Sequence, residues 1–259
     1  MRRGEDIYVG DYVDSVVTKD SYGVIEKILQ RKNYMIRPYV ANIDKAIILI
    51  ANEPAPDMLL VDKIIINCYT QGIEPILCFN KSDIADKKEI EEVFADYKDE
   101  LQTLRVSAVD RDGIEELKEV LKDSLACFLG QSAVGKSSLL NTLLEEEKAQ
   151  VGGLSEKIKR GKNTTRHIEI FEVLKGRIVD TCGFSMLECV DIKPEELCYY
   201  YDEYVHLAPL CKFTSCLHTV EPQCKVREEV EKGNLSKNRY FRYLTIFNEL
   251  KEKARKKYD

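Results

Sequence analysis

The sequence predicts an α/β fold with a mainly parallel sheet, and three observations support that prediction. Short apolar segments alternate with helical segments through most of the 259 residues, a pattern typical of parallel sheets covered by helices on both faces. Two polar loops with nucleotide-binding spacing each follow an apolar segment. Towards the C-terminus the pattern becomes helical around a cysteine and histidine cluster. We therefore expect a central α/β domain at 39–190, a short β segment at 1–38 and a helical metal-binding domain at 191–259.

The N-terminal segment is predicted to contribute two strands. Residues 9–17 and 24–29 are rich in β-branched residues, and the polar run 19–23 between them ends in a glycine, which is typical of a turn. A β segment of this length has too little apolar surface for a core of its own. We therefore expect it either to dock on the central domain or to fray.

The other elements are predicted from hydrophobic periodicity. The central strands are short apolar runs at 46–51, 75–79, 104–107, 125–129, 168–173 and 177–180. The central helices are expected at 57–71, 87–96, 113–121 and 136–144. In the C-terminal domain Pro194 opens a short helix, and 236–258 forms a long one. The apolar residues spaced to face the core of that last helix are Tyr240, Leu244, Phe247 and Leu250.

The segment Gly130 to Ser137 has the spacing of a phosphate-binding loop, Gly-x-x-x-x-Gly-Lys-Ser, between a strand and a helix. Its glycines allow backbone N–H groups to wrap the phosphates, and the following helix adds its positive N-terminus. Lys136 reaches the β- and γ-phosphates, and the Ser137 hydroxyl is a ligand for Mg²⁺. The predicted phosphate-binding residues are Gly130, Gln131, Ser132, Ala133, Val134, Gly135, Lys136, Ser137 and Ser138.

A second loop, Asn80-Lys81-Ser82-Asp83, indicates selection of guanine. It follows the apolar run 75–79 and so lies at the carboxyl end of a strand, where ligands gather in open α/β sheets. The Asp83 carboxylate can accept hydrogen bonds from N1–H and the exocyclic amine of guanine, whereas adenine has no such donor pair there. We expect Asn80 to tie this loop to the phosphate loop and the Lys81 stem to cover the base.

The order of these loops is inverted relative to ordinary GTPases, in which the phosphate loop comes first. Here the guanine loop precedes it, and so do Ser107 and Ala108, which are expected to present a backbone N–H to the guanine O6. Such an order arises by circular permutation, which is tolerated when the original termini lie close together at the surface. The sequence therefore predicts a circularly permuted P-loop GTPase domain.

Two later segments are expected to sense the γ-phosphate. Asp180 ends a strand and would hold Mg²⁺ through water, and the N–H of Gly183 would meet the γ-phosphate. Thr164 and Thr165, in a polar run between the two other elements, are the candidate switch threonines, with Thr165 as a Mg²⁺ ligand. The predicted catalytic residues are Lys136, Thr164, Thr165, Asp180 and Gly183.

Cys211, Cys216, His218 and Cys224 form a C-x4-C-x-H-x5-C cluster. Three thiolates and one imidazole complete a tetrahedral site, so we expect one structural Zn²⁺ with no open position for catalysis. Disulfides are the competing interpretation, but the other six cysteines are scattered singly, as in a reducing cytoplasm. We expect loss of a ligand to unfold the segment after Glu188 while sparing nucleotide binding.

Composition is that of an ordinary globular protein, with 44% hydrophobic and 32% charged residues. The chain has no run of eighteen apolar residues and no apolar leader, so we expect no membrane contact and a cytoplasmic location. We also expect a monomer. A net charge of −6 argues against indiscriminate nucleic-acid binding. Two basic clusters, at 157–166 and 239–257, are nevertheless candidates for contact with RNA phosphates, although charge runs are often only solvated faces.

Together, the permuted order, the loops 80–83 and 130–138, the segment 180–184 and the Cys/His cluster resemble the bacterial small-subunit-dependent GTPases of the RsgA type, over essentially the whole chain. The resemblance implies an N-terminal OB-fold, of which 1–38 would hold only the last strands. It also implies a GTPase stimulated by the 30S ribosomal subunit and acting in its late maturation. The GTP-bound form would engage the subunit and its rRNA, and hydrolysis to GDP and phosphate would release it.

Two positions predict slow intrinsic hydrolysis. Asn163 stands where the family usually has a histidine implicated in orienting the attacking water, and Phe184 stands where many GTPases carry a glutamine. Neither side chain is an effective general base. The short N-terminal segment and Asn163 favour an alternative function, a nucleotide-gated RNA-binding module with negligible turnover. Asp83 disfavours a third interpretation, an ATP-dependent kinase or ATPase.

Overall fold

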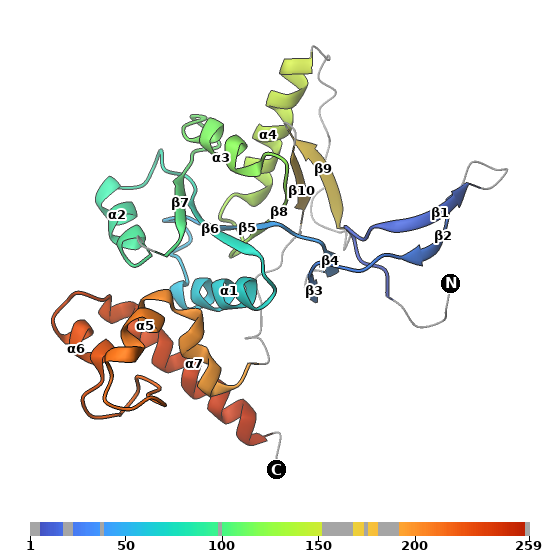
Figure 1. Ribbon diagram of the computed structural model, residues 1–259. Helices are drawn as coiled ribbons and strands as arrows, with labels where there is room; N and C mark the ends of the chain where they lie inside the picture. Colours follow the sequence, from blue (N-terminus) through green and yellow to red (C-terminus); the bar gives the residue numbers. More distant parts are fainter. Residues whose placement is uncertain are drawn as a thin grey trace.

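The computed structural model describes residues 6–17, 23–36, 39–97, 100–151, 168–173, 176–180 and 192–256. Within these ranges a six-stranded sheet forms the centre of the molecule. Two small two-stranded sheets lie on its N-terminal side, and a helical domain packs below it (Figure 1). No helix in the described ranges is long and apolar enough to span a membrane.

The central sheet has the strand order β7-β6-β5-β8-β10-β9, and all neighbouring pairs are parallel except β9 with β10. The strands are β5 Lys45–Ile50, β6 Glu74–Phe79, β7 Gln102–Arg105, β8 Leu125–Leu129, β9 Glu169–Val173 and β10 Gly176–Asp180. β5, β6 and β8 are buried along almost their whole length because helices cover both faces of the sheet. This arrangement explains the uninterrupted apolar runs and confirms the predicted α/β fold.

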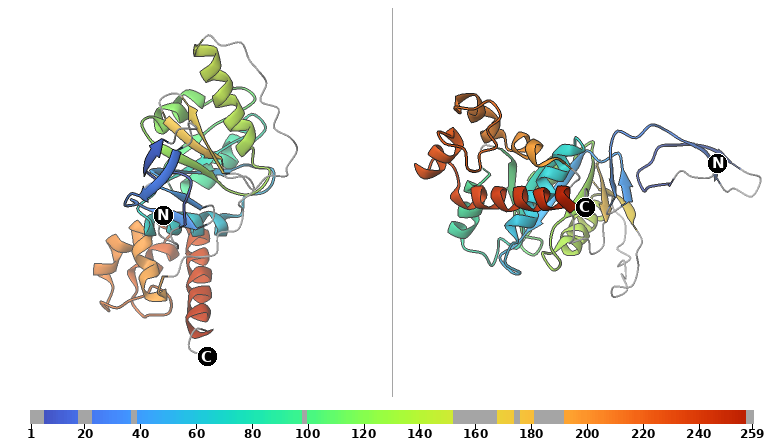
Figure 2. Two further views of the ribbon diagram at one scale, coloured as in Figure 1. Left: turned by 90° about the vertical axis from the view of Figure 1, so that its right-hand side faces the viewer. Right: turned by 90° about the horizontal axis from the view of Figure 1, so that it is seen from below.

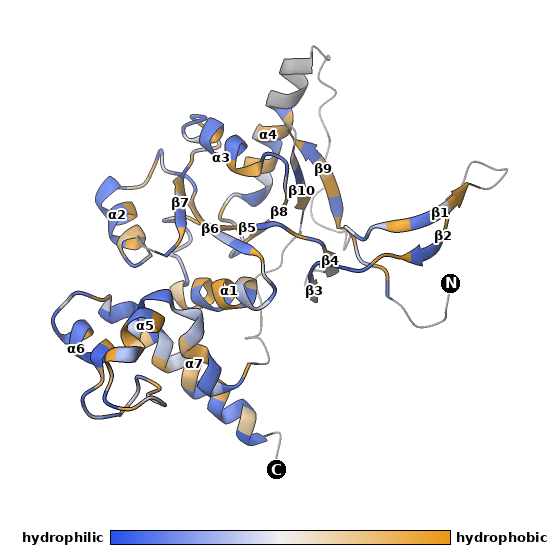
Figure 3. Ribbon diagram, in the orientation of Figure 1, coloured by the Kyte–Doolittle hydropathy of each residue, from blue (hydrophilic) through white to orange (hydrophobic). Residues whose placement is uncertain are grey.

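Helices cover the sheet in two layers, which Figure 2 shows from two further directions. They are α1 Met58–Thr70, α2 Lys87–Ala95, α3 Ile114–Leu121 and α4 Lys136–Val151. Alternate residues of β5 enter two separate apolar clusters, Ile48 with Ile65 of α1 on one face and Ile47 with Leu117 of α3 on the other. Figure 3 shows α1 as a largely apolar helix between the sheet and the C-terminal domain.

The N-terminal segment docks on the central domain, as predicted. Its strands are β1 Val13–Val17, β2 Gly23–Ile28 and β3 Tyr34–Ile36, and β3 pairs with β4 Tyr39–Ala41 at the start of the central domain. Met35 and Val40 are buried in the apolar cluster of the central domain, and Ala41 N–H donates to Val9 O at 2.8 Å. The β1–β2 hairpin instead projects away from the body (Figure 1), and its Val17 is 75% exposed. Assignment of these strands to an OB-fold stays a prediction.

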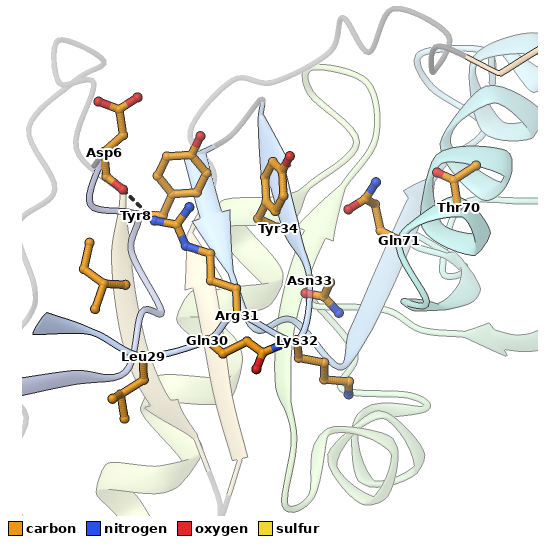
Figure 4. Close-up of a pocket in the computed structure, with 11 residues that line it drawn as sticks. Asp6, Tyr8, Leu29, Gln30, Arg31, Lys32, Asn33, Tyr34, Thr70 and Gln71 are labelled. Atoms are coloured by element: carbon orange, nitrogen blue, oxygen red, sulfur yellow. Dashed lines mark hydrogen bonds between the residues drawn. The ribbon is translucent and has the colours of Figure 1, made fainter. Parts of the chain in front are cut away.

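Arg31 holds the N-terminal segment together. Its guanidinium donates to both carboxylate oxygens of Asp11, at 2.7 and 2.9 Å, and lies 4.1 Å from the centre of the Tyr8 ring. Burial alone would raise the pKa of Asp11, but the hydrogen bonds from Arg31 and from Tyr8 N–H lower it below its ordinary value. Tyr8, Arg31 and Tyr34 line a cavity of about 680 Å³ beside the end of α1 (Figure 4). Because Asp11 balances the charge of Arg31, we interpret the cluster as structural support.

The C-terminal domain consists of short helices around the cysteine cluster and one long helix. Its elements are the 3-10 helices η1 Pro194–Tyr200 and η2 Ala208–Leu210, and the α-helices α5 Asp202–Leu207, α6 Lys225–Glu231 and α7 Lys237–Lys256. Tyr240, Phe247 and Leu250 of α7 are buried and Leu244 is partly buried, as the helical spacing predicts. Ile66 of α1 belongs to the same apolar cluster, so this domain shares a core with the central one.

Two residues assigned to the basic cluster 239–257 do not face solvent. The Arg239 side chain is 4% exposed and forms ion pairs with Glu100 and Glu203. Arg242 pairs with Asp62 of α1 and, at 3.1 Å, with Asp96. The predicted availability of these two arginines to RNA is therefore wrong, because the register of α7 turns them toward α1 and the end of α2.

Candidate functional site

The described loops with nucleotide-binding spacing meet at one edge of the central sheet. β5, β6, β7, β8 and β10 run parallel, and the register places Ile50 beside Phe79 and Phe79 beside Arg105. The residues that follow these strands therefore emerge at the same carboxyl edge. The sheet thus brings together loops that are widely separated in the sequence.

The backbone of the phosphate loop depends on its two glycines. Gly130 has φ of 128°, and a Cβ there would lie 2.1 Å from Leu49 O. Gly135 has φ of 94°, and a Cβ there would lie 2.3 Å from Asn80 Nδ2. Side chains at these positions would separate the loop from β5 and from the guanine loop. Ala133 also adopts a left-handed conformation, with φ of 66°, although it carries a Cβ.

Lys136 lies within the phosphate loop. Its ammonium donates to Gly130 O at 2.7 Å and to Gln131 O. Burial lowers the pKa of Lys136 from its ordinary value, and the carboxylate of Asp180 opposes that shift. Asp180 is buried at the end of β10, so the structure brings these two predicted residues together. Ser137 and Ser138 are exposed in the first turn of α4.

Asn80 ties the guanine loop to the phosphate loop, as the sequence predicts. Its Nδ2 donates to Val134 O at 2.9 Å, and the residue is buried. The neighbouring Lys81 has φ of 61° and donates from Nζ to Glu53 O at 2.7 Å. The lysine therefore has a protein partner that was not predicted, in the connection between β5 and α1.

Asp83 is oriented by a hydroxyl group. Ser107 Oγ lies 2.7 Å from Asp83 Oδ1 and accepts from the N–H groups of Val109 and Asp110 at 3.2 and 3.0 Å. Because these two N–H groups engage the hydroxyl oxygen, its proton is directed to Asp83. The sequence predicts only a backbone contact for Ser107 and Ala108. The position of this segment after a strand indicates a site residue but does not indicate the role of the Ser107 hydroxyl.

The connection between β5 and α1 supports both loops, a role that the sequence does not predict. Asp57 N–H donates to Gln131 Oε1 at 2.9 Å, and Asp57 Oδ1 accepts from Leu60 N–H at 3.0 Å, which caps α1. An aspartate before an apolar helical run is a local N-cap signal. The contact with Gln131 has no local signal because the two residues are 74 positions apart.

The predicted switch residues belong to segments that the structure does not describe. Thr164, Thr165 and Gly183 lie outside the described residues, as do Asn163 and Phe184. Their roles stay predictions.

The second candidate site is the cysteine and histidine cluster of the C-terminal domain. The structure brings the four predicted ligands together, with all ligand atoms within 4.8 Å of one another. His218 Nδ1 lies 3.7 Å from Cys211 Sγ, 3.6 Å from Cys216 Sγ and 3.4 Å from Cys224 Sγ. A tetrahedral zinc site with Zn–S of about 2.3 Å and Zn–N of about 2.0 Å requires S···N distances of about 3.5 Å. The spacing of the donor atoms therefore fits such an ion.

The ligand loop is held by α7 and by one carboxylate. Tyr240 and Tyr243 donate from their hydroxyls to His218 O and Leu217 O at 2.9 and 2.6 Å. Glu221 accepts from the N–H groups of Leu217, Thr219 and Val220. Burial alone would raise the pKa of Glu221, but these N–H groups lower it below its ordinary value.

The neutral form of His218 also suits a metal, and the thiols of the cluster would lose their protons on binding one. Burial lowers the pKa of His218, which keeps its imidazole neutral as a metal ligand must be. Burial, together with the nearby thiols of Cys224 and Cys211, raises the pKa of Cys216 to about 12. Three thiolates this close together need a cation between them, which a bound metal supplies.

Comparison with known proteins identifies relatives that match almost the full length of the chain. The RsgA GTPase family model matches residues 28–190. A relative from Caldanaerobacter subterraneus subsp. tengcongensis is 42% identical over 96% of this chain and 85% of its own length. One from Geobacillus sp. is 39% identical over 95% of this chain and 85% of its own length. Both relatives are named small ribosomal subunit biogenesis GTPase RsgA.

Solved structures agree. The crystal structure of YjeQ from Thermotoga maritima matches with a TM-score of 0.80 and 35% identity, over 95% of this chain and 84% of that one. YloQ, described as a circularly permuted GTPase, matches with a TM-score of 0.78 and 29% identity, over 97% of this chain and 83% of that one. The predicted family and the permuted GTPase fold are therefore confirmed. The chain belongs to the RsgA GTPase family.

Proposed function

We propose that this protein is a GTP hydrolase that acts in late maturation of the small ribosomal subunit. The GTP-bound form engages the 30S subunit and its rRNA, and hydrolysis to GDP and phosphate releases it. The observation that carries this proposal is the convergence of Asp83, Ser107, Lys136 and Asp180 at one edge of the sheet, in a chain of the RsgA family. The relatives named for small ribosomal subunit biogenesis supply the cellular role.

The proposed guanine contact follows from the orientation of Asp83. With Oδ1 held by Ser107, the exposed carboxylate of Asp83 accepts from N1–H and the exocyclic amine of guanine. The Lys81 stem covers the base, and a backbone N–H of the Ser107-Ala108 segment meets the guanine O6. Asn80 keeps the guanine loop in register with the phosphate loop.

The proposed phosphate contacts follow from the loop 130–138. Its backbone N–H groups wrap the phosphates, and Lys136 exchanges its two carbonyl partners for phosphate oxygens. A hydroxyl at Ser137 and a buried carboxylate at Asp180 are oxygen donors of the kind that Mg²⁺ takes, so the donor set fits. Ser137 and Thr165 would hold Mg²⁺ directly, and Asp180 would hold it through water. The charge of Mg²⁺ would offset the negative charge of the phosphates.

Hydrolysis requires the switch segments. We propose that Thr164 and Thr165 sense the γ-phosphate and that the Gly183 N–H binds it. Because Asn163 and Phe184 are poor general bases, the positioning of the attacking water depends on the 30S subunit. The basic residues at 157–166 give that loop a means of contacting rRNA phosphates.

We propose one structural Zn²⁺ held by Cys211, Cys216, His218 and Cys224, on the donor spacing described above. The proposed domains are a partial OB-fold at 1–38, the permuted GTPase domain at 39–190 and the helical zinc domain at 191–259. We also propose a cytoplasmic location and a monomeric state. Light scattering of the purified chain would check the monomeric state.

Nucleotide selectivity tests the proposed activity. We expect the wild type to bind and hydrolyse GTP, to bind GDP and to bind ATP at least a hundredfold more weakly. Lys136→Ala should abolish turnover while the protein stays folded. Equal affinity for ATP and GTP would contradict the assignment of Asp83. GTP binding without any turnover, with or without 30S subunits, would support the alternative, a nucleotide-gated RNA-binding module.

A further inference from the structure

The connection between β5 and α1, residues 51–57, contacts both nucleotide loops. Its Glu53 carbonyl accepts from Lys81 of the guanine loop at 2.7 Å, and its Asp57 N–H donates to Gln131 of the phosphate loop at 2.9 Å. Asp57 is also the N-cap of α1. The position of the first turn of α1 therefore determines where Asp57 donates its hydrogen bond to Gln131 of the phosphate loop.

The same helix is anchored to the C-terminal domain. Asp62 is 2% exposed and accepts from Arg242 Nε of α7 and from the Tyr97 hydroxyl. Lys63 pairs with Glu249 of α7 at 2.6 Å. Figure 1 shows α1 lying between the sheet and α7, with its N-terminal end toward the nucleotide loops.

The burial of Asp62 makes this anchor energetically significant. An ionised carboxylate without a partner is costly in the protein interior, so the packing of α1 depends on Arg242. A helix of 13 residues transmits a displacement along its length because its backbone is hydrogen-bonded throughout. Loosening α7 against α1 therefore shifts Asp57 relative to Gln131.

We propose that Gln131 is a positioning residue for the phosphate loop, and that the C-terminal domain supports nucleotide binding through α1 and the Asp57–Gln131 hydrogen bond. The inference rests on the proposed nucleotide site. The sequence-based expectation is that unfolding of the C-terminal domain spares nucleotide binding. We propose instead that it weakens nucleotide binding, because Ile66 of α1 packs in the core of that domain and Asp62 of α1 pairs with Arg242 of α7.

A double-mutant cycle tests this linkage with the full-length, metal-loaded protein and fluorescently labelled GDP. Gln131→Met keeps the side-chain length but removes the acceptor, and we expect GDP affinity to fall about threefold to tenfold, as for one lost hydrogen bond. Arg242→Lys keeps a positive charge near Asp62 but loses the contacts of the guanidinium with Asp96 at 3.1 Å and with the Tyr97 hydroxyl at 3.2 Å. We expect GDP affinity to fall about twofold to fivefold. The GDP affinity of the double variant should equal that of whichever single variant binds GDP more weakly. The reason is that both changes break the same connection from α7 through α1 to Gln131.

Two controls separate positioning from general destabilisation. Lys232→Ala removes the ion pairs of an exposed lysine with Glu228 and Glu229 in the same domain and should leave GDP affinity unchanged. Glu249→Gln, which removes the partly exposed pair with Lys63, is the substitute if Arg242→Lys lowers the yield of folded protein. Hydrogen exchange of the Asp57 amide in nucleotide-free protein should accelerate in Gln131→Met and stay protected in Gln131→Glu, whose carboxylate still accepts.

The linkage is overturned if the effects of Gln131→Met and Arg242→Lys multiply in the double variant. It is also overturned if Arg242→Lys and Glu249→Gln both keep GDP affinity within twofold of the wild type. A wild type that does not bind GDP would refute the proposed function instead. In that case, amide hydrogen exchange would test the linkage without nucleotide. If the Asp57 and Leu60 amides exchange at the same rate in Arg242→Lys as in the wild type, the linkage is overturned.

Discussion

At the scale of single residues, the phosphate loop contains an unusual backbone position. Ala133 has φ of 66°, a left-handed conformation that costs a residue with a Cβ about 1 kcal/mol. Glycine adopts this conformation without the steric penalty but loses more chain entropy on folding. The local conformation therefore stores a small amount of strain.

We expect Ala133→Gly to stabilise the protein by up to about 1 kcal/mol, because relief of the strain exceeds the entropic cost. Urea unfolding of the nucleotide-free protein measures this change. Ala95→Gly, at an exposed position in the last turn of α2, is the matched control and should destabilise by about 0.5 to 1 kcal/mol. Equal destabilisation by the two substitutions would show that Ala133 is not strained.

Asp83→Asn should shift nucleotide preference from guanine to xanthine. The new amide can donate to the C2 carbonyl of xanthine, whereas it repels the exocyclic amine of guanine. The Ser107 hydroxyl can still donate to the remaining carbonyl oxygen, so the loop should keep its conformation. Competition of GDP and XDP for the wild type and the variant measures the shift. Retention of guanine preference by a folded variant would rule out Asp83 as the selecting group.

Individual contacts differ in how far the sequence predicts them. The tie from Asn80 to the phosphate loop followed from the motif and is present. The hydroxyl of Ser107 lay in a predicted segment, but its orienting role depends on turn geometry that the sequence does not encode locally. The pairing of Gln131 with Asp57 depends on how β5 and β8 lie side by side, so only the folded chain reveals it.

At the scale of elements, predictability depends on length and burial. β8 matches its predicted bounds, and β5 and β6 differ by a residue at their ends, because strands buried on both faces are uninterrupted apolar runs. β3 and β4, with three residues each, are too short to show a period and were not predicted. α4 continues to Val151 beyond its predicted end because strong helix formers follow its apolar residues.

The metal loop yields a prediction at this scale. We expect one tightly bound zinc per folded chain, and we expect Cys216→Ser or chelation to unfold 192–256, since three remaining ligands leave an open site. Elemental measurement and hydrogen exchange of α7 would detect both effects. Cys198→Ala, which changes a buried cysteine outside the cluster, should keep one zinc per chain. A folded, reduced wild type without metal would refute the assignment.

At the scale of the whole molecule, the domains form one body through buried charge as well as apolar contact. The sequence predicted the order of the domains but treated Arg239 and Arg242 as surface charges. Side chains of this type are usually exposed, and only the docking of α7 on α1 and α2 reveals their buried partners.

Stimulation by the ribosomal subunit tests the central claim most directly. Multiple-turnover GTP hydrolysis would be measured at low salt with and without purified 30S subunits, with Lys136→Ala as the inactive control and Asn163→His as a variant with a raised intrinsic rate. We predict a slow intrinsic rate that 30S subunits raise at least tenfold, and a stimulation that falls steeply with added salt because rRNA phosphates contact the basic loop. A wild-type rate unchanged by 30S subunits at low salt would contradict the ribosome-coupled mechanism.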